Sequence, residues 1–108
     1  MPNMLVILES PYAGEVERNK TYAVRCMKDS LHRGESPLLS HLLYTQCLDD
    51  TVPEERKMGM SAGWDWIKQS GKTAVYEDYG ISSGMEQGIK IAKELGHEIE
   101  YRRIGKNP

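Results

Sequence analysis

The chain has 108 residues, of which 39% are hydrophobic and 28% charged, and its formal net charge is −2. This length suits a single domain with a small core, so association with other copies would add stability. The slightly acidic balance argues against general binding to nucleic-acid polymers and anionic membranes, because phosphate groups favour basic surfaces. A nucleoside or nucleotide remains compatible with this charge, since it needs only a local group of hydrogen-bond donors.

No apolar run approaches the roughly 18 residues of a membrane span, and the N-terminal segment shows neither a basic start nor a cleavage site. We therefore expect a cytoplasmic protein. Cys26 and Cys47 are isolated, which predicts free thiols, with Cys26 buried on a helix and Cys47 in a loop. The sequence indicates no metal site and no cofactor.

The first third of the chain predicts a strand, a turn and a helix. Met4–Glu9 is a continuous apolar run, typical of a central strand that is buried on both faces. Ser10–Gly14 is predicted to be a turn, and Glu15–Arg33 a helix that ends at Gly34. The apolar residues at helical spacing are Val16, Ala23, Val24, Met27 and Leu31.

The middle third predicts a second strand over Pro37–Tyr44 and a second helix over Pro53–Ser70. The cap of this helix is expected at Asp50 or Thr51, and its apolar stripe at Met60, Trp64 and Ile67. Gly59 and Gly63 each weaken a helix by about 1 kcal/mol relative to alanine, so close packing against another helix or another subunit is expected there.

The last third predicts a strand over Lys72–Glu77, a turn over Asp78–Ser83 and a helix over Gly84–Leu95 that Gly96 closes. The apolar face of this helix consists of Met85, Ile89, Ala92 and Leu95. Glu98–Ile104 alternates charged and apolar residues, as an exposed edge strand does. The order β-α-β-α-β-α-β predicts an α/β fold, with a mostly parallel sheet of about four strands and helices on both faces.

In such a sheet, ligands bind at the carboxyl ends of the strands, where the two turns lie. In the first turn, Pro11 fixes the backbone, Gly14 permits close approach, and Tyr12 can stack on a base or bond a sugar. Free N–H groups at the following helix start could bind a phosphate or carboxylate, and Asn19 could reach the same crevice. No dinucleotide or P-loop motif is present, so an ordinary connection is the alternative.

The second turn is richer in small and polar residues, which are Asp78, Gly80, Ser82, Ser83 and Gly84. Its serines can cap the following helix and also donate to a ligand. Glu86 lies in the first turn of that helix, where it either complements the helix dipole or acts as nucleophile or base in glycosyl transfer. His41, which lies among leucines, is either a core or rim histidine or a further ligand contact.

Five segments form a recognisable pattern: Glu9–Gly14, Asn19 with Ala23, Ser40–Tyr44, Pro53–Arg56 and Gly80–Met85. In these segments the chain resembles small phage and bacterial proteins of uncharacterised function that are related to the nucleoside 2-deoxyribosyltransferases. The resemblance implies one Rossmann-like three-layer domain over residues 1–108, which binds a nucleoside or nucleotide and forms homo-oligomers. It also implies that Glu86 attacks the anomeric carbon, that Tyr12 supports it, and that Asp78 is a base or sugar contact.

Two main functions therefore remain open. The first is an enzyme that hydrolyses or transfers the N-glycosidic bond of a nucleoside or nucleotide, with Ser10, Ser82 and Ser83 as ligand contacts. The second is a non-catalytic protein that senses or sequesters a nucleotide on the same fold. In a third, less specific interpretation the turns are plain connections in a structural or interaction protein.

Overall fold

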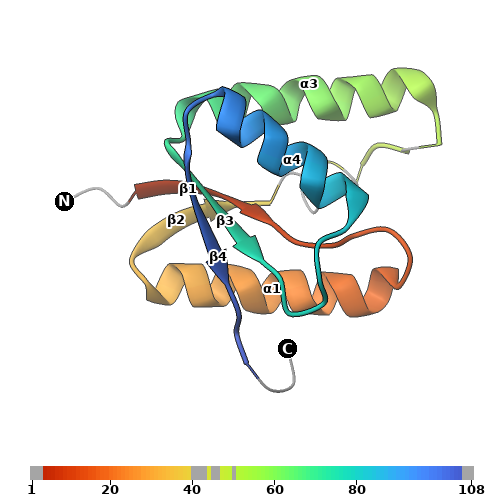
Figure 1. The fold of residues 1–108 in the computed structure, drawn as a ribbon. Helices are drawn as coiled ribbons and strands as arrows, with labels where there is room; N and C mark the ends of the chain where they lie inside the picture. The colour runs from red at the N-terminus through yellow and green to blue at the C-terminus, as the bar shows by residue number, and fades with distance from the viewer. Residues whose placement is uncertain (1–3, 40–43, 45–46, 50, 106–108) are drawn as a thin grey trace.

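The computed structural model describes residues 4–39, 44, 47–49 and 51–105 (Figure 1). Its elements, in chain order, are β1 (Met4–Glu9), α1 (Val16–His32), β2 (Glu35–Leu38), α3 (Pro53–Gln69), β3 (Lys72–Tyr76), α4 (Ser83–Glu94) and β4 (Glu98–Arg102). The strands form one parallel sheet in the order β2-β1-β3-β4. Helix α1 covers one face of the sheet, and α3 and α4 lie on the other, which confirms the predicted three-layer α/β fold.

Strand β1 is central, as its apolar sequence predicts. It pairs with β2 on one side, where Ile7 lies opposite Leu38, and with β3 on the other, where Leu8 lies opposite Ala74. Residues Val6, Ile7 and Leu8 are buried. Strand β4 forms one edge of the sheet, as the alternating pattern of its sequence predicts.

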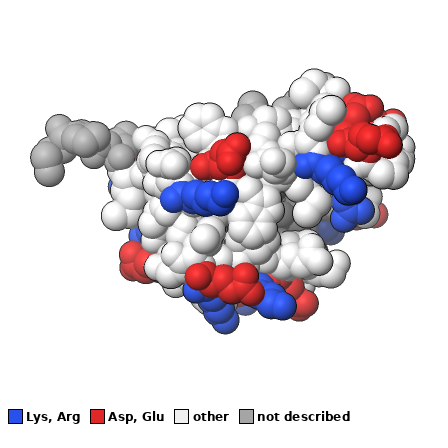
Figure 2. Space-filling view, turned by 90° about the horizontal axis from the view of Figure 1, so that it is seen from above, with Lys and Arg blue, Asp and Glu red and all other residues white. Residues whose placement is uncertain are grey.

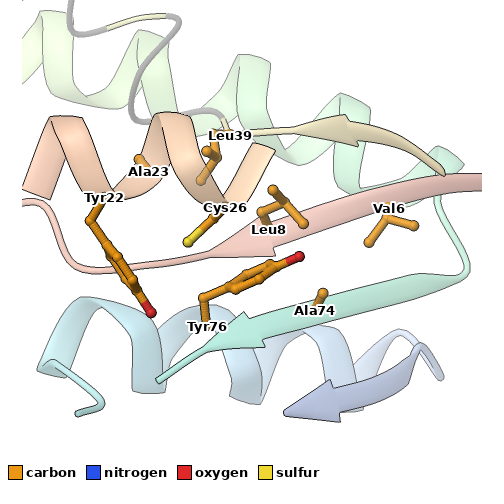
Figure 3. Packing of buried hydrophobic residues seen from close by; sticks show 8 residues of the cluster. All are labelled: Val6, Leu8, Tyr22, Ala23, Cys26, Leu39, Ala74 and Tyr76. Carbon is orange, nitrogen blue, oxygen red and sulfur yellow. The ribbon is translucent and has the colours of Figure 1, made fainter. Parts of the chain in front are cut away.

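The larger core cluster lies between α1 and the sheet (Figure 3). Its buried members are Val6, Leu8, Tyr22, Ala23, Cys26, Leu39, Ala74 and Tyr76. Because the chain has no phenylalanine, Tyr22 and Tyr76 are the largest fully buried side chains. A smaller cluster of Val75, Met85 and Ile89 joins α4 to the opposite face of the sheet.

The buried face of α1 differs from the predicted one. Val24 and Leu31 are more than half exposed, whereas the buried residues are Asn19, Tyr22, Ala23, Cys26 and Ser30. The helix is rotated so that polar groups with partners enter the core, since the Tyr22 hydroxyl donates to Asp78 and the Ser30 hydroxyl to Glu35. Cys26 is a buried free thiol, as expected, and Cys47 is an exposed one.

Three further predictions are corrected by the structure. Strand β2 ends at Leu38, so it begins and ends earlier than predicted, and residues 40–43 lie outside the described part of the chain. The N-cap position of α3 is Val52, which makes no side-chain capping bond. Leu95 is 40% exposed beyond the end of α4.

Gly59 on α3 has a close neighbour, as its position predicts. A Cβ atom built there would lie 3.4 Å from Leu48 Cδ1 and 3.7 Å from Tyr44 Cβ. The segment that precedes α3 therefore packs against this glycine, in place of the expected helix or subunit. Among the described residues, no helix combines the length and the apolar character needed to cross a membrane.

Candidate functional site

The sheet has one topological switch point, which lies between β1 and β3. These strands are parallel neighbours, but α1 follows β1 on one face of the sheet and α4 follows β3 on the other (Figure 1). The two connections leave the sheet in opposite directions and open a crevice at the carboxyl ends of the strands, where ligands bind in open α/β sheets.

A cleft of about 390 Å³ lies above this point, between α3 and α4. Its residues come from the end of β1 (Leu8, Glu9, Ser10, Tyr12, Ala13), from α3 (Arg56, Gly59, Met60, Gly63, Trp64, Ile67) and from the start of α4 (Ser82, Ser83, Gly84, Met85, Gln87, Gly88, Ile91). Figure 2 shows the molecule from the side on which α3 and α4 lie; its charged side chains form separate groups with uncharged surface between them.

The two helical walls give the cleft a polar end and an apolar end. Both helices start at the carboxyl edge of the sheet, where Arg56, Ser82 and Ser83 lie. Ile67 and Ile91 lie two or three helical turns further on, at the opposite end. The cleft can therefore accept a ligand that is polar at one end and apolar at the other.

Glu9 carries the carboxyl group of this cleft. It is the last residue of β1, it lines the cleft, and it is only partly exposed. Burial raises the pKa of the Glu9 carboxyl to about 8, and no hydrogen bond or ion pair with a described residue offsets that effect. The group is therefore largely protonated at neutral pH and offers both a donor and an acceptor to the cleft.

Gly88 on α4 makes room for this carboxyl group. A Cβ atom built on Gly88 would lie 2.6 Å from Glu9 Oε1 and closer still to Oε2. Any side chain at position 88 would therefore push the carboxyl group from its present position.

Ser10 and Tyr12, two of the predicted site residues, line the cleft next to Glu9. Ser10 is 5% exposed, and its hydroxyl oxygen has no hydrogen-bond partner in the described part of the chain. A buried polar group without a partner is costly, so a ligand that bonds the hydroxyl would recover that cost.

The start of α4 brings Ser82, Ser83 and Gly84 to the cleft, as the sequence predicts. Ser82 is the N-cap, and its side chain accepts a hydrogen bond of 3.3 Å from the Met85 amide. The predicted capping role of Ser82 is confirmed.

Glu86 is exposed and is not among the residues that line the cleft, although its neighbours Gln87 and Gly88 are. At this point of α4 the helix turns residues 84, 87, 88 and 91 toward the cleft, and position 86 lies on another side of the helix. The structure thus does not bring Glu86 together with Tyr12.

Asp78 does not line the cleft, because its carboxylate is bound within the fold. It accepts hydrogen bonds from the Tyr22 hydroxyl at 2.6 Å and from the amides of Ile104 at 3.0 Å and Gly105 at 3.2 Å. Burial by itself would raise the pKa of Asp78, but these donors outweigh burial and hold the pKa below its usual value. The group anchors the segment that follows β4.

Asn19 supports the first turn from behind. Its amide nitrogen donates to the carbonyl oxygens of Tyr12 at 3.0 Å and Ala13 at 3.2 Å. Asn19 is buried and does not line the cleft, so it positions the turn that carries Tyr12.

The remaining predicted site residues shape the turns or fall outside the structure. Pro11 is buried, and Gly14 and Gly80 adopt φ values of +91° and +83° that favour glycine; none of the three lines the cleft. His41 lies outside the described residues. Within the described part of the chain, His, Cys, Asp and Glu side chains form no group of three or more that could hold a metal.

The site also contains residues that the sequence interpretation did not select, above all Glu9 and Gly88. One signal was available for Glu9, since it is the only charged residue in the otherwise apolar run of β1 and stands at its carboxyl end. No local pattern indicates Gly88. The apolar stripe of α3 and its two glycines were predicted, but their place in the wall of a cleft depends on how the helices pack.

The comparisons with known proteins agree with this architecture. A solved structure of a 2-deoxyribosyltransferase from the psychrotolerant bacterium Bacillus psychrosaccharolyticus is similar, with a TM-score of 0.67 and 15% sequence identity. The similarity covers 96% of this chain and 75% of that one, and at this identity it concerns the fold. The search of curated proteins gave no match. A family model described as a domain of unknown function (DUF7768) matches residues 4–102, and the chain therefore belongs to that family.

Proposed function

We propose that the cleft between α3 and α4 binds a nucleoside or nucleotide, and that the protein hydrolyses or transfers the N-glycosidic bond of this ligand. The observation that carries the proposal is the cleft itself. It lies at the switch point and combines a carboxyl group, a buried hydroxyl without a partner among the described residues, and an apolar wall. The fold shared with a 2-deoxyribosyltransferase adds support.

The parts of the cleft match the parts of such a ligand. Trp64, Met60 and Ile91 supply apolar surface for a base, and Ser10 and Tyr12 supply hydroxyl groups that can bond a sugar. A phosphate, where present, would fit the end at which Arg56 lies near the start of α4.

Cleavage of an N-glycosidic bond proceeds through a centre with oxocarbenium character, which a nearby carboxylate stabilises or captures. Glu86 remains the nucleophile that the sequence predicts, and the reaction would then require Glu86 or its helix to turn toward the ligand. The exposed position of Glu86 outside the cleft is the specific observation that favours the second candidate, a non-catalytic nucleotide-binding protein.

The test combines binding and product formation. The four 2′-deoxynucleosides and their 5′-monophosphates are screened by thermal shift, since a ligand that binds the folded state raises the melting temperature. Each is then incubated with the protein, with and without a second free base, and released or exchanged base is measured chromatographically. We expect at least one compound to raise the melting temperature and to yield free or exchanged base.

Two matched variants tie the result to the cleft. Ser83→Trp places a large side chain at the cleft wall, and Lys90→Trp places the same side chain on an exposed position of α4 outside the cleft. Ser83→Trp should lower affinity at least tenfold, and Lys90→Trp should not change it. Binding without any base release would favour the second candidate, and the absence of a shift with all eight compounds would overturn both.

A further inference from the structure

The surroundings of Glu9 differ from those of two other acidic residues with low exposure, Asp78 and Glu35. Asp78 is partly buried and Glu35 is buried, and each accepts hydrogen bonds from donors of the fold. No described residue donates to the Glu9 carboxyl group. Its oxygen atoms lie against the backbone of Gly88 and reach the cleft.

A side chain without a structural partner in this position has no evident role in holding the fold together. Gly88 lies directly against it, and a glycine has no side chain that could satisfy a carboxyl group. The space at Gly88 keeps the group in the cleft wall, where a bound molecule would meet it.

We infer that Glu9 is a ligand-contacting residue of the cleft, which donates a hydrogen bond from its protonated carboxyl group to an uncharged acceptor of the bound nucleoside. The inference rests on the proposed function and goes beyond it, because it names the recognising group and the chemistry of the ligand atom. The acceptor is a ring nitrogen, a carbonyl oxygen or a sugar oxygen of the nucleoside.

The other charged and titratable groups that line the cleft do not remove the proton from Glu9. Tyr12 from the first turn and Arg56 from α3 are the other titratable residues that line the cleft. Arg56 forms no ion pair with Glu9, and the residues of α4 that line the cleft are uncharged. Because the pKa of Glu9 is about 8, the donor is present at pH 6.5 and mostly lost at pH 9.0.

Binding of the four 2′-deoxynucleosides is therefore measured by calorimetry at pH 6.5 and 9.0. The wild-type protein is compared with Glu9→Gln, Glu9→Ala and the control Glu94→Gln, which changes an exposed glutamate of α4 outside the cleft. Glu9→Gln keeps a donor that does not titrate, whereas Glu9→Ala removes it. Changes in pH affect the ligands equally in all four proteins, so differences between the proteins report on Glu9.

In the wild type and in Glu94→Gln, the affinity should fall about tenfold between the two pH values, which is the usual value of one hydrogen bond. At pH 6.5 the affinity of Glu9→Gln should lie within about threefold of that of the wild type. Its affinity should be the same at pH 6.5 and at pH 9.0. Glu9→Ala should bind about tenfold more weakly at pH 6.5. If both Glu9 variants bind the nucleosides as tightly as the wild type at both pH values, this inference is overturned and the proposed function stands.

A measurement without ligand tests the protonation of Glu9 separately from the binding of a nucleoside. Glu9 holds its proton in the folded state between pH 4.5 and 8, where the unfolded chain releases it, so the folded protein loses stability as pH rises through this range. The melting temperature of the wild type should fall relative to that of Glu9→Gln between pH 5 and 8.5. Equal profiles would show that the Glu9 carboxyl group is not protonated in this range and would overturn this inference. The absence of nucleoside binding at either pH would also overturn this inference, and the proposed function falls with it only if none of the 5′-monophosphates raises the melting temperature either.

Discussion

Two acidic residues at the carboxyl edge of the sheet have opposite surroundings and opposite protonation. The Asp78 carboxylate accepts three hydrogen bonds from Tyr22, Ile104 and Gly105, and its pKa is lowered in spite of burial. The Glu9 carboxyl group accepts none from the described residues, and burial alone raises its pKa. Hydrogen bonds to the charged form thus decide which residue supports the fold and which is available to a ligand.

Asp78→Ala should destabilise the protein by about 2–3 kcal/mol, because it leaves the Tyr22 hydroxyl and two amides without their acceptor. Chemical denaturation measures this free energy of unfolding. The control is Glu77→Gln, which removes the neighbouring carboxylate and its exposed ion pair with Arg103 and should cost less than about 1 kcal/mol. Equal effects of the two substitutions would contradict the anchoring role of Asp78.

At the scale of elements, α4 both closes the core and forms a wall of the cleft. Met85 and Ile89 pack on the sheet, while Ser83, Gly84 and Gly88 face α3 across the cleft. A glycine in mid-helix normally costs about 1 kcal/mol relative to alanine. The position of the Glu9 carboxyl group against Gly88 explains why this helix accepts that cost.

Gly88→Ala should therefore have different effects in two backgrounds. In Glu9→Ala, where the carboxyl group is gone, it should stabilise the protein by about 1 kcal/mol through helix propensity. In the wild type the gain should shrink or reverse, because the end of the Glu9 side chain must move away. Free energies of unfolding for the four proteins give the coupling, and a coupling of zero would exclude the packing of Glu9 against Gly88.

At the scale of the whole molecule, one ionic network joins the two edge strands across the sheet. Arg102 at the end of β4 donates to both carboxylate oxygens of Glu35 at the start of β2, at 2.8 and 2.6 Å. It also bonds Glu100, which lies 2.7 Å from the Lys72 ammonium group. The hydrogen bonds from Arg102 lower the pKa of both Glu35 and Glu100 to about 2.

Arg102→Leu should destabilise the protein by about 3–5 kcal/mol, because it leaves the buried Glu35 carboxylate without its main partner. The network also predicts an acid transition. Glu35 and Glu100 bind protons more weakly in the folded state, so their contribution is complete above pH 4.5 and is lost as pH falls toward 2. Denaturation from pH 7 to pH 2 should show this loss in the wild type and a much smaller one in Arg102→Leu.

The sequence by itself determined the elements and the edge at which a site forms. The apolar run of Met4–Glu9, the helical spacing after it and the glycines at 34 and 96 are local signals, and local periodicity fixes the order of strands and helices. That order makes the sheet parallel, which brings the turns after β1 and β3 to one edge.

Only the tertiary structure decided which carboxyl group faces the cleft. Glu9 and Glu86 both lie near that edge in the sequence, and the rotation of α4 on the sheet turns Gly88 inward and Glu86 to the surface. This rotation depends on how Met85 and Ile89 pack against Val75, and packing between distant segments leaves no local trace in a single sequence. For the same reason, only the folded molecule showed that the apolar stripe of α3 forms a wall of the cleft and that Glu9 is buried enough to hold its proton.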